Sequence, residues 1–453
     1  MNYFIFSLYI ITLILIIWDS VVLNINIIKS WKWSKASNTT LSKIKELKML
    51  PNIYILIPVL QEQDVICDTI DHILKMPYAG KKEILIITTE REIHESKDWE
   101  GSTPAIVKQC VNNNLYLDVK LLHYPNIKGG KSDQLNFGLD YLWHKKSIDR
   151  QNSYIALYDA DSRPEINTFV RFSQFVNMYF KSRSTLPTAI QQPSLFMRNF
   201  NKVSLYPKLE ALFATRWVLG HEIRTQLKSV IYKYSWNVPY AYVVGHGMFI
   251  KADFLEKTNG FSVPYDDIHM GQRLDFLGES IHPLPLFDIC DIAPSMSEIT
   301  KQSGRWFGNG LIWSEFLRTR KLGIKMNSIR SITLLFKGLI DSFSWMHYLL
   351  HYISLILISY LLPNKIIFVI ATFTFVTLDS ILGILIMLQY LKKFEIKINE
   401  ELYLNKISKL LICIYAPFRG IIRGFGPILW LIQQLKYLLI GKYDLPKTAR
   451  SKN

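Results

Sequence analysis

The chain has 453 residues, of which 49% are hydrophobic and 13% aromatic, and its formal net charge is +16. This length is sufficient for a large folded domain with additional segments. The four cysteines lack CxxC spacing, which argues against a disulfide framework and a zinc site. A basic chain can bind nucleic acid, but many of these lysines follow an apolar segment, as is typical of the cytoplasmic side of a membrane. We therefore expect a membrane protein without a nucleic-acid partner.

The N-terminal 28 residues form the first apolar segment, in which Asp19 is the only charged residue. It is long enough to cross a hydrocarbon core of roughly 30 Å. It lacks the basic start and the small-residue cleavage site of a signal peptide, so we expect an uncleaved transmembrane anchor over residues 1–28. Residues 29–50 are rich in lysine and predict a basic cytosolic linker.

Residues 51–309 predict an α/β domain, because apolar strands alternate with amphipathic helices. Strands are expected near residues 52–58, 83–90, 118–122 and 154–158. Several of these runs are apolar without alternation, as in strands that are covered on both faces of a sheet. Right-handed crossovers between such strands give a doubly wound sheet.

Asp159 and Asp161 follow the last of these strands. In extended geometry, two residues two positions apart project from the same side of the chain. Ligands of open parallel sheets bind beyond the carboxyl ends of the strands, where two carboxylates can hold Mg²⁺ or Mn²⁺ against a diphosphate. The alternative is a solvated turn, since Asp-x-Asp-Ser before a proline is ordinary loop chemistry.

A glycine-rich stretch, Lys128 to Ser132, precedes a helix that carries Leu135 and Leu139. It resembles half of a P-loop, but the first glycine of that motif is missing, so we reject a nucleoside triphosphatase. A helix N-terminus with Lys131 beside it can still bind phosphate oxygens.

Asp266 and Asp267 lie at the start of a further expected helix. Aspartate is a favoured helix cap, so a purely structural role and a catalytic role both remain open. Gln302, Arg305 and Trp306 then share one helical face. A guanidinium binds phosphate in a bidentate manner and an indole packs on a sugar ring, although a surface helix that packs one tryptophan would show the same pattern.

The C-terminal third predicts membrane contact throughout. Residues 310–343 mix apolar and basic side chains, as in interfacial amphipathic helices, and residues 344–391 predict a transmembrane hairpin. Residues 392–453 are expected to be cytosolic, interfacial or re-entrant, because prolines and arginines interrupt their apolar segment. This organisation predicts a multi-pass protein of the cell membrane with a cytoplasmic catalytic domain.

Four stretches in this order resemble the membrane-bound family 2 glycosyltransferases, a group that includes cellulose, chitin and hyaluronan synthases and ceramide glucosyltransferase. They are Pro58 with Glu62, Asp159-x-Asp161, Asp266-Asp267 and Gln302-x-x-Arg305-Trp306. The resemblance implies a GT-A fold, a nucleotide-sugar donor (by default a UDP-sugar) and inversion at the anomeric carbon. One departure concerns the second strand, where the family often has Asp-Asp-Gly and this chain has Thr88-Thr89-Glu90.

The resemblance also implies roles for individual residues. Asp267 would be the catalytic base, and Asp161 with Asp159 would hold Mg²⁺ or Mn²⁺. The residues expected to bind the nucleotide-sugar are Pro58, Glu62, Glu90, Lys131, Asn136 and Asp159. The residues expected to bind the acceptor and the pyrophosphate are Asp266, Gln302, Arg305 and Trp306.

Two classes of function follow from the sequence. The first is an active glycosyltransferase that uses a glycan or lipid-linked acceptor and contacts membrane lipid, with a polysaccharide synthase complex as a further partner. The second is a catalytically silent relative that binds a glycan or lipid, or acts as a scaffold. Silent relatives usually lose the base or the arginine-tryptophan pair, and both are present here. Processive synthesis and single-sugar transfer remain open alternatives within the first class.

Overall fold

The computed structural model describes residues 2–96, 100–114, 118–233, 235, 238–309, 312–361, 365–393 and 406–440. Its strands are β1 (Asn52–Pro58), β2 (Lys82–Thr89), β3 (Val119–Tyr124), β4 (Ser153–Leu157), β5 (Arg163–Pro164), β6 (Ala189–Gln191), β7 (Ser194–Leu195), β8 (Met248–Lys251), β9 (Ile281–Pro283) and β10 (Asp288–Ile289). The α-helices of the α/β domain are α2 (Ile66–Lys75), α3 (Glu90–Ser96), α4 (Thr103–Asn114), α5 (Lys131–Asp140), α6 (Thr168–Arg183), α7 (Leu205–Trp217), α8 (Ile223–Ile231), α9 (Ala252–Lys257), α10 (Ile268–Phe276) and α11 (Met296–Asn309). Helices outside this domain are α1 (Asn2–Ser42), α12 (Ile312–Lys321), α13 (Ser328–Ser344), α14 (His347–Leu361), α15 (Lys365–Lys393) and α16 (Lys406–Ile440), and short π-helical turns occur at η1 (Tyr141–Lys145) and η2 (Val218–Glu222).

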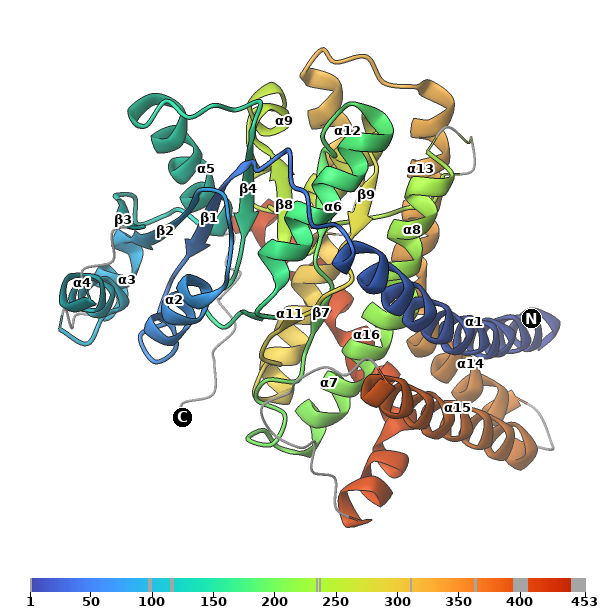
Figure 1. The fold of residues 1–453 in the computed structure, drawn as a ribbon. Coiled ribbons are helices and arrows are strands. Elements are labelled where there is room, and N and C mark those ends of the chain that lie inside the picture. Colours follow the sequence, from blue (N-terminus) through green and yellow to red (C-terminus); the bar gives the residue numbers. More distant parts are fainter. Residues whose placement is uncertain are drawn as a thin grey trace.

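A seven-stranded mixed sheet with the order β3-β2-β1-β4-β8-β6-β9 forms the centre of the α/β domain (Figure 1). Strands β1 to β4 are mutually parallel where they pair, whereas β8 is antiparallel to both of its neighbours. The predicted α/β fold with a doubly wound mixed sheet is therefore confirmed, and it is GT-A-like. A small second sheet, β5-β10-β7, lies next to the segment that follows β4.

Both faces of the main sheet are buried, which explains why the strand sequences do not alternate. On β1, Leu56 belongs to a core cluster with residues of α5 and α10, while Ile55 and Ile57 belong to another cluster with residues of α2 and α6. The same division holds on β4, where Ile155 and Ala156 belong to different clusters. The sheet is thus fixed from two sides, and its strand ends form a rigid base for a site.

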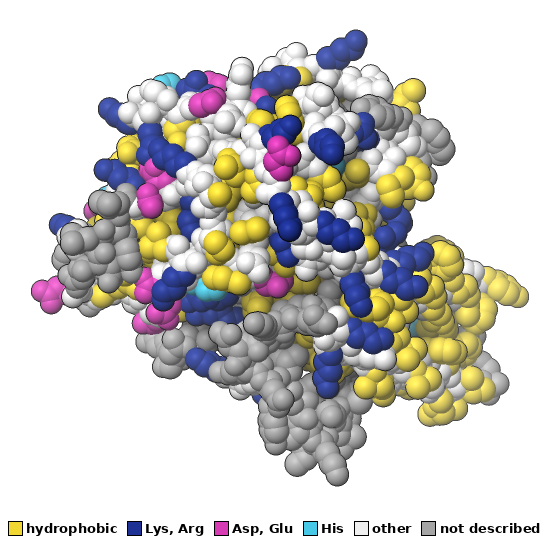
Figure 2. Space-filling model, viewed as in Figure 1, with side chains coloured by type: hydrophobic (Ala, Val, Ile, Leu, Met, Phe, Trp, Pro, Cys, Tyr) yellow, Lys and Arg dark blue, Asp and Glu magenta, His cyan; other side chains and the backbone are white. Residues whose placement is uncertain are grey.

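The helices α1, α14 and α15 pack together and project from one side of the α/β domain (Figure 1). Their outer side chains are largely apolar, and on the face shown in Figure 2 lysines and arginines lie where they join the domain. Within the described residues, two helices, Tyr3–Ser42 and Ile366–Lys393, are long and apolar enough to cross a membrane. The first does not end at residue 28 but continues as one helix through most of the segment that we expected to be a linker.

The predicted span over residues 345–362 is shorter than expected. Helix α14 has 15 residues, and its apolar part is Leu349–Ile358. At 1.5 Å per residue it is roughly 22 Å long, which is less than the roughly 30 Å of a hydrocarbon core. Residues 362–364, between the two helices of the predicted hairpin, lie outside the described residues.

The C-terminal segment also differs from the expectation. Residues 406–440 form the single helix α16, although prolines and arginines occur in its middle. Its partners are α11, α7, α14 and α15, so it joins the α/β domain to the apolar helices. The basic tail after residue 440 lies outside the described residues.

Candidate active site

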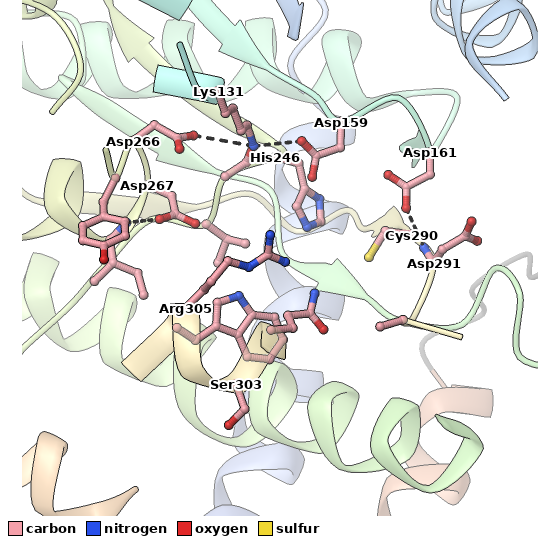
Figure 3. A pocket seen from close by; sticks show the side chains of 18 of the residues that line it. Lys131, Asp159, Asp161, His246, Asp266, Asp267, Cys290, Asp291, Ser303 and Arg305 are labelled. Atoms are coloured by element: carbon pink, nitrogen blue, oxygen red, sulfur yellow. Dashed lines mark hydrogen bonds and ion pairs between the residues drawn. The ribbon is translucent and has the colours of Figure 1, made fainter. Parts of the chain in front are cut away.

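A cavity of about 1130 Å³ opens beyond the carboxyl ends of β1 and β4 (Figure 3). Its walls come from the loop after β1, the start of α5, the turn after β4, the start of α10 and helix α11, together with α7, α13 and α16. Of the expected site residues, those that line it are Pro58, Glu62, Lys131, Asp159, Asp161, Asp266, Asp267, Gln302, Arg305 and Trp306. The fold therefore gathers expected site residues that are up to about 250 positions apart in the sequence into one cavity.

Lys131 is the first residue of α5 and lies between acidic side chains (Figure 3). Its ammonium donates to Asp159 Oδ1 at 2.8 Å and to the carbonyl of Gly245 at 2.9 Å, and lies 3.5 Å from Asp266 Oδ2. Burial disfavours this charge, but the carboxylates prevail and raise the pKa of Lys131 above its ordinary value. A permanent positive charge is thus fixed at the helix N-terminus, where anions are already favoured.

Asp159 and Asp161 lie in a turn and not in extended geometry, which corrects our expectation for this pair. The amide of Ser162 donates to the carbonyl of Asp159 at 3.1 Å, and the Asp159 amide donates to the Ser162 hydroxyl. Both carboxylates nevertheless face the cavity, because the turn follows directly after β4. Asp161 also accepts a hydrogen bond from the amide of Asp291 at 3.1 Å, so it contributes to local structure as well.

The acidity of Asp159 depends on its neighbours. Burial alone would raise the pKa of its carboxyl, but the ammonium of Lys131 and the ring of His246 lower it below the usual value. Asp159 is therefore ionised at neutral pH and able to act as a ligand of a cation.

His246 is a site residue that the sequence analysis missed. Strand β8 pairs with β4 in an antiparallel register whose last pair is Leu157 and Met248, so the segment before β8 lies beside the turn after β4. The imidazole Nδ1 lies 2.7 Å from Asp288 Oδ2, and the Asp288 side chain is fully buried. Although burial disfavours the charged ring, this bond raises the pKa of His246 to about 9. The only sequence signal was the Gly-His-Gly turn before a strand.

Asp267 caps α10 and also faces the cavity. Its Oδ1 accepts a hydrogen bond from the amide of Ile268 at 2.7 Å, as the structural alternative predicted. A β-carbon added to Gly245 would lie 3.2 Å from Asp267 Oδ2 and 2.9 Å from the Lys131 ammonium. The second carboxylate oxygen of Asp267, Oδ2, therefore lies on the side of Lys131. Capping and catalysis are thus compatible, because they use different oxygens.

Asp266, the neighbouring carboxyl, is 7% exposed and faces Lys131. Burial raises its pKa to about 6, and the charge of Asp267 adds to this effect, while Lys131 opposes it. Asp266 therefore gains a proton on mild acidification, near pH 6.

Helix α11 carries Gln302, Arg305 and Trp306 into the cavity, as their spacing predicts. The guanidinium of Arg305 is directed into the space between Asp267 and Asp159 (Figure 3). Trp306 packs edge-on against Phe196 at a ring-centroid distance of 6.3 Å. The trio is part of the site wall and does not form a surface patch.

Glu90 and Asn136, two of the expected donor-binding residues, do not line the cavity. Glu90 begins α3 and pairs with His123 at 2.9 Å. Asn136 exchanges two hydrogen bonds with the backbone of Phe261, so its amide is used to hold that loop. Both residues were expected in the donor site because of the family resemblance. In the structure, their contacts hold neighbouring segments of the protein together.

The sequence analysis also missed the wall formed by α16. Arg419, Ile422 and Arg423 of this helix line the cavity together with Glu210 and Trp217 of α7. Two arginines four positions apart in an apolar segment share one helical face, and that was the available signal. We interpreted it only as an interruption of a membrane span.

Comparison with known proteins gives one strong match. Residues 51–309, more than half of the chain, match the family model described as "Glycosyltransferase like family 2". No curated protein matches. Solved structures with some similarity include "Crystal Structure of a Mycobacterial Protein", with 16% identity, a TM-score of 0.35 and coverage of 61% of this chain and 76% of that chain.

Two further similar structures are of glucosyl-3-phosphoglycerate synthase from Mycobacterium tuberculosis. One, with Mn²⁺, UDP and glucosyl-3-phosphoglycerate, has 14% identity, a TM-score of 0.33 and coverage of 61% of this chain and 82% of that chain. The other, with Mg²⁺ and UDP, has 14% identity, a TM-score of 0.32 and coverage of 61% and 81%. The family match, with the GT-A-like sheet, assigns the protein: the chain belongs to the family 2-like glycosyltransferases and is an enzyme of that class.

Proposed function

We propose that the protein is a membrane-bound, inverting glycosyltransferase that transfers a sugar from a UDP-sugar to a glycan or lipid-linked acceptor. The observation that carries this proposal is the convergence of cations and carboxylates in one cavity. Lys131, His246 and Arg305 come from separate elements and surround the same space as Asp159 and Asp267. This is the arrangement that a departing nucleoside diphosphate and an attacking hydroxyl require.

The donor diphosphate lies, in this proposal, against Lys131 and Arg305. An ammonium at a helix N-terminus and a guanidinium both bind phosphate oxygens, and the second does so in a bidentate manner. His246 adds a further positive charge beside the turn that carries Asp159. Pro58 and Glu62, at the end of β1, line the same part of the cavity and would contact the nucleoside.

Mg²⁺ or Mn²⁺ would be held by Asp159 and Asp161. Within the described residues there is no group of three or more His, Cys, Asp or Glu side chains that could hold a metal ion alone. Two carboxylates fit the requirement nevertheless, because Mg²⁺ usually binds through one or two carboxylates plus substrate phosphates and water. When bound, the ion would neutralise charge on the departing diphosphate.

Asp267 acts as the base in this proposal. The acceptor hydroxyl attacks the anomeric carbon, the bond from that carbon to the diphosphate oxygen breaks, and the hydroxyl proton passes to the Asp267 carboxylate. The nucleoside diphosphate leaves with the bonding electron pair, and a single displacement inverts the configuration. Trp306 and Gln302 would position the acceptor sugar, the first by ring stacking and the second by hydrogen bonds.

The membrane part of the proposal rests on the apolar helices. Two of them have sufficient length and apolar character to span a bilayer. Helix α13 adds an exposed apolar face at helical spacing, which suits a membrane surface; its residues are Ile329, Ile332, Phe336, Leu339 and Ile340. The lysines that follow the apolar part of α1 support a cytoplasmic catalytic domain.

A donor-panel assay on the purified full-length protein tests this function. We expect one nucleotide-sugar to be hydrolysed slowly without acceptor, to be consumed faster when cell extract is added, and to be spared when a chelator removes divalent metal. A folded protein that neither binds nor consumes any nucleotide-sugar in the presence of Mg²⁺ and Mn²⁺ would favour the silent-relative alternative.

A further inference from the structure

The cavity has a second part that the proposed donor site does not use. We call it the α16 chamber and define it by its lining residues, which are Glu210, Trp217, Glu222, Asp341, Trp345, Arg419 and Arg423. Glu210 and Trp217 belong to α7, Glu222 to η2 and Asp341 to α13. Trp345 follows α13, and Arg419 and Arg423 belong to α16. Because α7 and α16 also pack against α15, this chamber adjoins the apolar helices.

A close helix crossing joins the chamber to the active site. Gly304 of α11 lies against Gly426 of α16, where a β-carbon on Gly304 would meet the Gly426 carbonyl at 2.9 Å. The hydroxyl of Ser303 donates to the carbonyl of Arg423 at 3.2 Å at the same crossing. Arg305 and Arg423 therefore enter one cavity from two helices whose relative position is fixed.

The two arginines of α16 differ in their partners. Arg419 lies 2.9 Å from Glu210 Oε1, so its charge is compensated within the protein. Among the described residues we find no ion pair of Arg423. Its guanidinium lies instead over the ring of Trp345, 4.2 Å from the centroid, and 6.0 Å from that of Trp217. Burial, together with the repulsion of Arg419, lowers its pKa to about 10, so Arg423 stays charged at neutral pH.

Two carboxyls, those of Glu210 and Asp341, act on the charge of Arg423, and Glu210 is already paired with Arg419. Burial raises the pKa of Asp341 to about 6 and that of Glu222 to about 7, and Glu222 also accepts a hydrogen bond from the Tyr242 hydroxyl at 3.1 Å. Arg423 opposes the upward shift of the Asp341 pKa, so Asp341 is the carboxyl of the chamber that shares charge with Arg423. A half-buried guanidinium that lies over an indole and lines open volume is typical of a site for a planar or tetrahedral oxyanion.

We propose that the α16 chamber binds a phosphate group of the acceptor at Arg423, which makes the acceptor a phosphate ester. This proposal rests on the proposed function, because it names the acceptor class of the same enzyme. The phosphate serves as a handle: it holds the acceptor while a hydroxyl of the same molecule reaches Asp267. Trp217 and Trp345 provide apolar surface beside that handle. The phosphate can belong to a membrane lipid or to a soluble sugar phosphate.

The test compares acceptor pools with and without phosphate. Total lipid and water-soluble extract from cells that make the protein are each divided, and one half is treated with phosphatase, which is then removed. The full-length protein is supplied with the donor found in the panel assay, and the ratio of sugar transfer to donor hydrolysis is measured. We expect phosphatase treatment to reduce this ratio at least 10-fold in one pool, and the pool identifies the source of the phosphate.

Variants connect this selectivity to Arg423. In Arg423→Gln the ratio should fall at least 10-fold, the KM for the untreated acceptor pool should rise, and phosphatase treatment should no longer matter. Arg423→Lys retains a point charge and should restore part of the selectivity. Lys436→Gln, an exposed basic residue of the same helix, is the matched control and should behave like the wild type.

Each other outcome counts against the proposal. Equal transfer before and after phosphatase treatment in both pools would show that the acceptor needs no phosphate. Selectivity that persists in Arg423→Gln would place the phosphate elsewhere. An enzyme without donor turnover fails at the panel assay, before acceptor selectivity is measured, so that failure of the proposed function is distinguishable. A melting curve for each variant separates misfolding from loss of binding, and Arg423→Lys decides the case if Arg423→Gln does not fold.

Discussion

Asp161 has two roles at the residue scale, and they can be separated by substitution. Its carboxylate would be a metal ligand, but its Oδ2 also accepts the hydrogen bond from the amide of Asp291, and the residue is 5% exposed. Asp161→Ala therefore removes a buried acceptor and would cost stability of about 1 kcal/mol or more. Asp161→Asn keeps an oxygen for that amide and removes only the charge.

We predict that Asp161→Asn unfolds at nearly the wild-type temperature but loses metal-dependent turnover by at least 100-fold. The physical reason is that a neutral amide is a poor ligand for a hard divalent cation. Calorimetry and the donor assay at several Mg²⁺ and Mn²⁺ concentrations provide the two readings. Normal activity with an unchanged metal requirement would remove Asp161 from the proposed metal site.

Glu165, outside the cavity, gives a prediction about pH. Burial raises the pKa of its carboxyl to about 7, although the amide of Phe287 donates to it at 2.7 Å. The folded protein therefore retains a proton that the unfolded chain has already lost, in the window between the ordinary value of 4.5 and about 7. Stability contributed by this group is present below that window and decreases as pH rises through it.

Glu165→Gln removes this titration while keeping an oxygen for Phe287. We expect the melting temperature of the variant, relative to that of the wild type, to increase by a few degrees between pH 5 and pH 8. Thermal unfolding at both pH values measures this difference. A constant difference would mean that Glu165 ionises normally in the folded protein.

At the scale of elements, the position of α10 decides where Asp267 points. The guanidinium of Arg273 on this helix pairs with the fully buried Glu315 of α12 at 2.7 Å, and Asp275 lies 3.5 Å from Arg330 of α13. The helix that carries the proposed base is thus held by the helices that follow the α/β domain. These buried pairs fix a register, and removing one partner would leave an uncompensated charge.

The crossing of α11 and α16 supports a sharper prediction. Gly304→Ala places a methyl group against the carbonyl of Gly426, so the two helices must separate by a few tenths of an ångström or more. We expect transfer to fall more than donor hydrolysis, because the α16 chamber moves while Lys131 and Asp159 stay in place. The ratio of the two rates measures this effect, and an unchanged ratio would show that the crossing does not position the chamber.

The elements that the sequence predicted well are those with a local pattern. The apolar runs at β1, β2 and β4 are buried strands as predicted, α5 follows the glycine-rich stretch, and Gln302, Arg305 and Trp306 lie on one helix. The helix α14 begins at His347, after the start of the predicted span, and its apolar part is limited to Leu349–Ile358. The single helix α16 was missed because prolines suggested a break that its packing against several helices overrides.

The site residues also divide into those with a local sequence pattern and those that only tertiary contacts bring to the site. Lys131, Asp159 and Arg305 lie in motifs and were expected in the site, where the structure places them. His246 reaches the site because β8 pairs with β4. Arg423 reaches it because α16 crosses α11, although Arg423 and Arg305 are more than 100 positions apart in the sequence. Such contacts are set by tertiary structure, and no local sequence pattern contains them.

For the whole molecule, we predict that the α/β domain and the segments near Lys48 and Lys325 face the cytoplasm, because basic residues flank the apolar helices on that side. Single cysteines introduced at these two positions should react with a membrane-impermeant reagent only after the cells are permeabilised. A cysteine introduced near Tyr3, at the N-terminal end of the first span and on the opposite side of the membrane, serves as the control. Labelling near Lys48 from outside intact cells would reverse the topology.

The central claim is that this cavity transfers sugar with Asp267 as the base, and Asp267→Asn tests it most directly. An asparagine caps a helix about as well as an aspartate, so the free energy of unfolding should change by less than about 1 kcal/mol. Loss of a general base should reduce transfer by roughly 100-fold or more. Donor binding should persist, since Lys131 and Arg305 remain, and Asp266→Asn should have a milder effect. The assay compares the transfer rates and melting curves of the wild type and both variants side by side. Near-normal transfer by a stable Asp267→Asn protein would contradict the account.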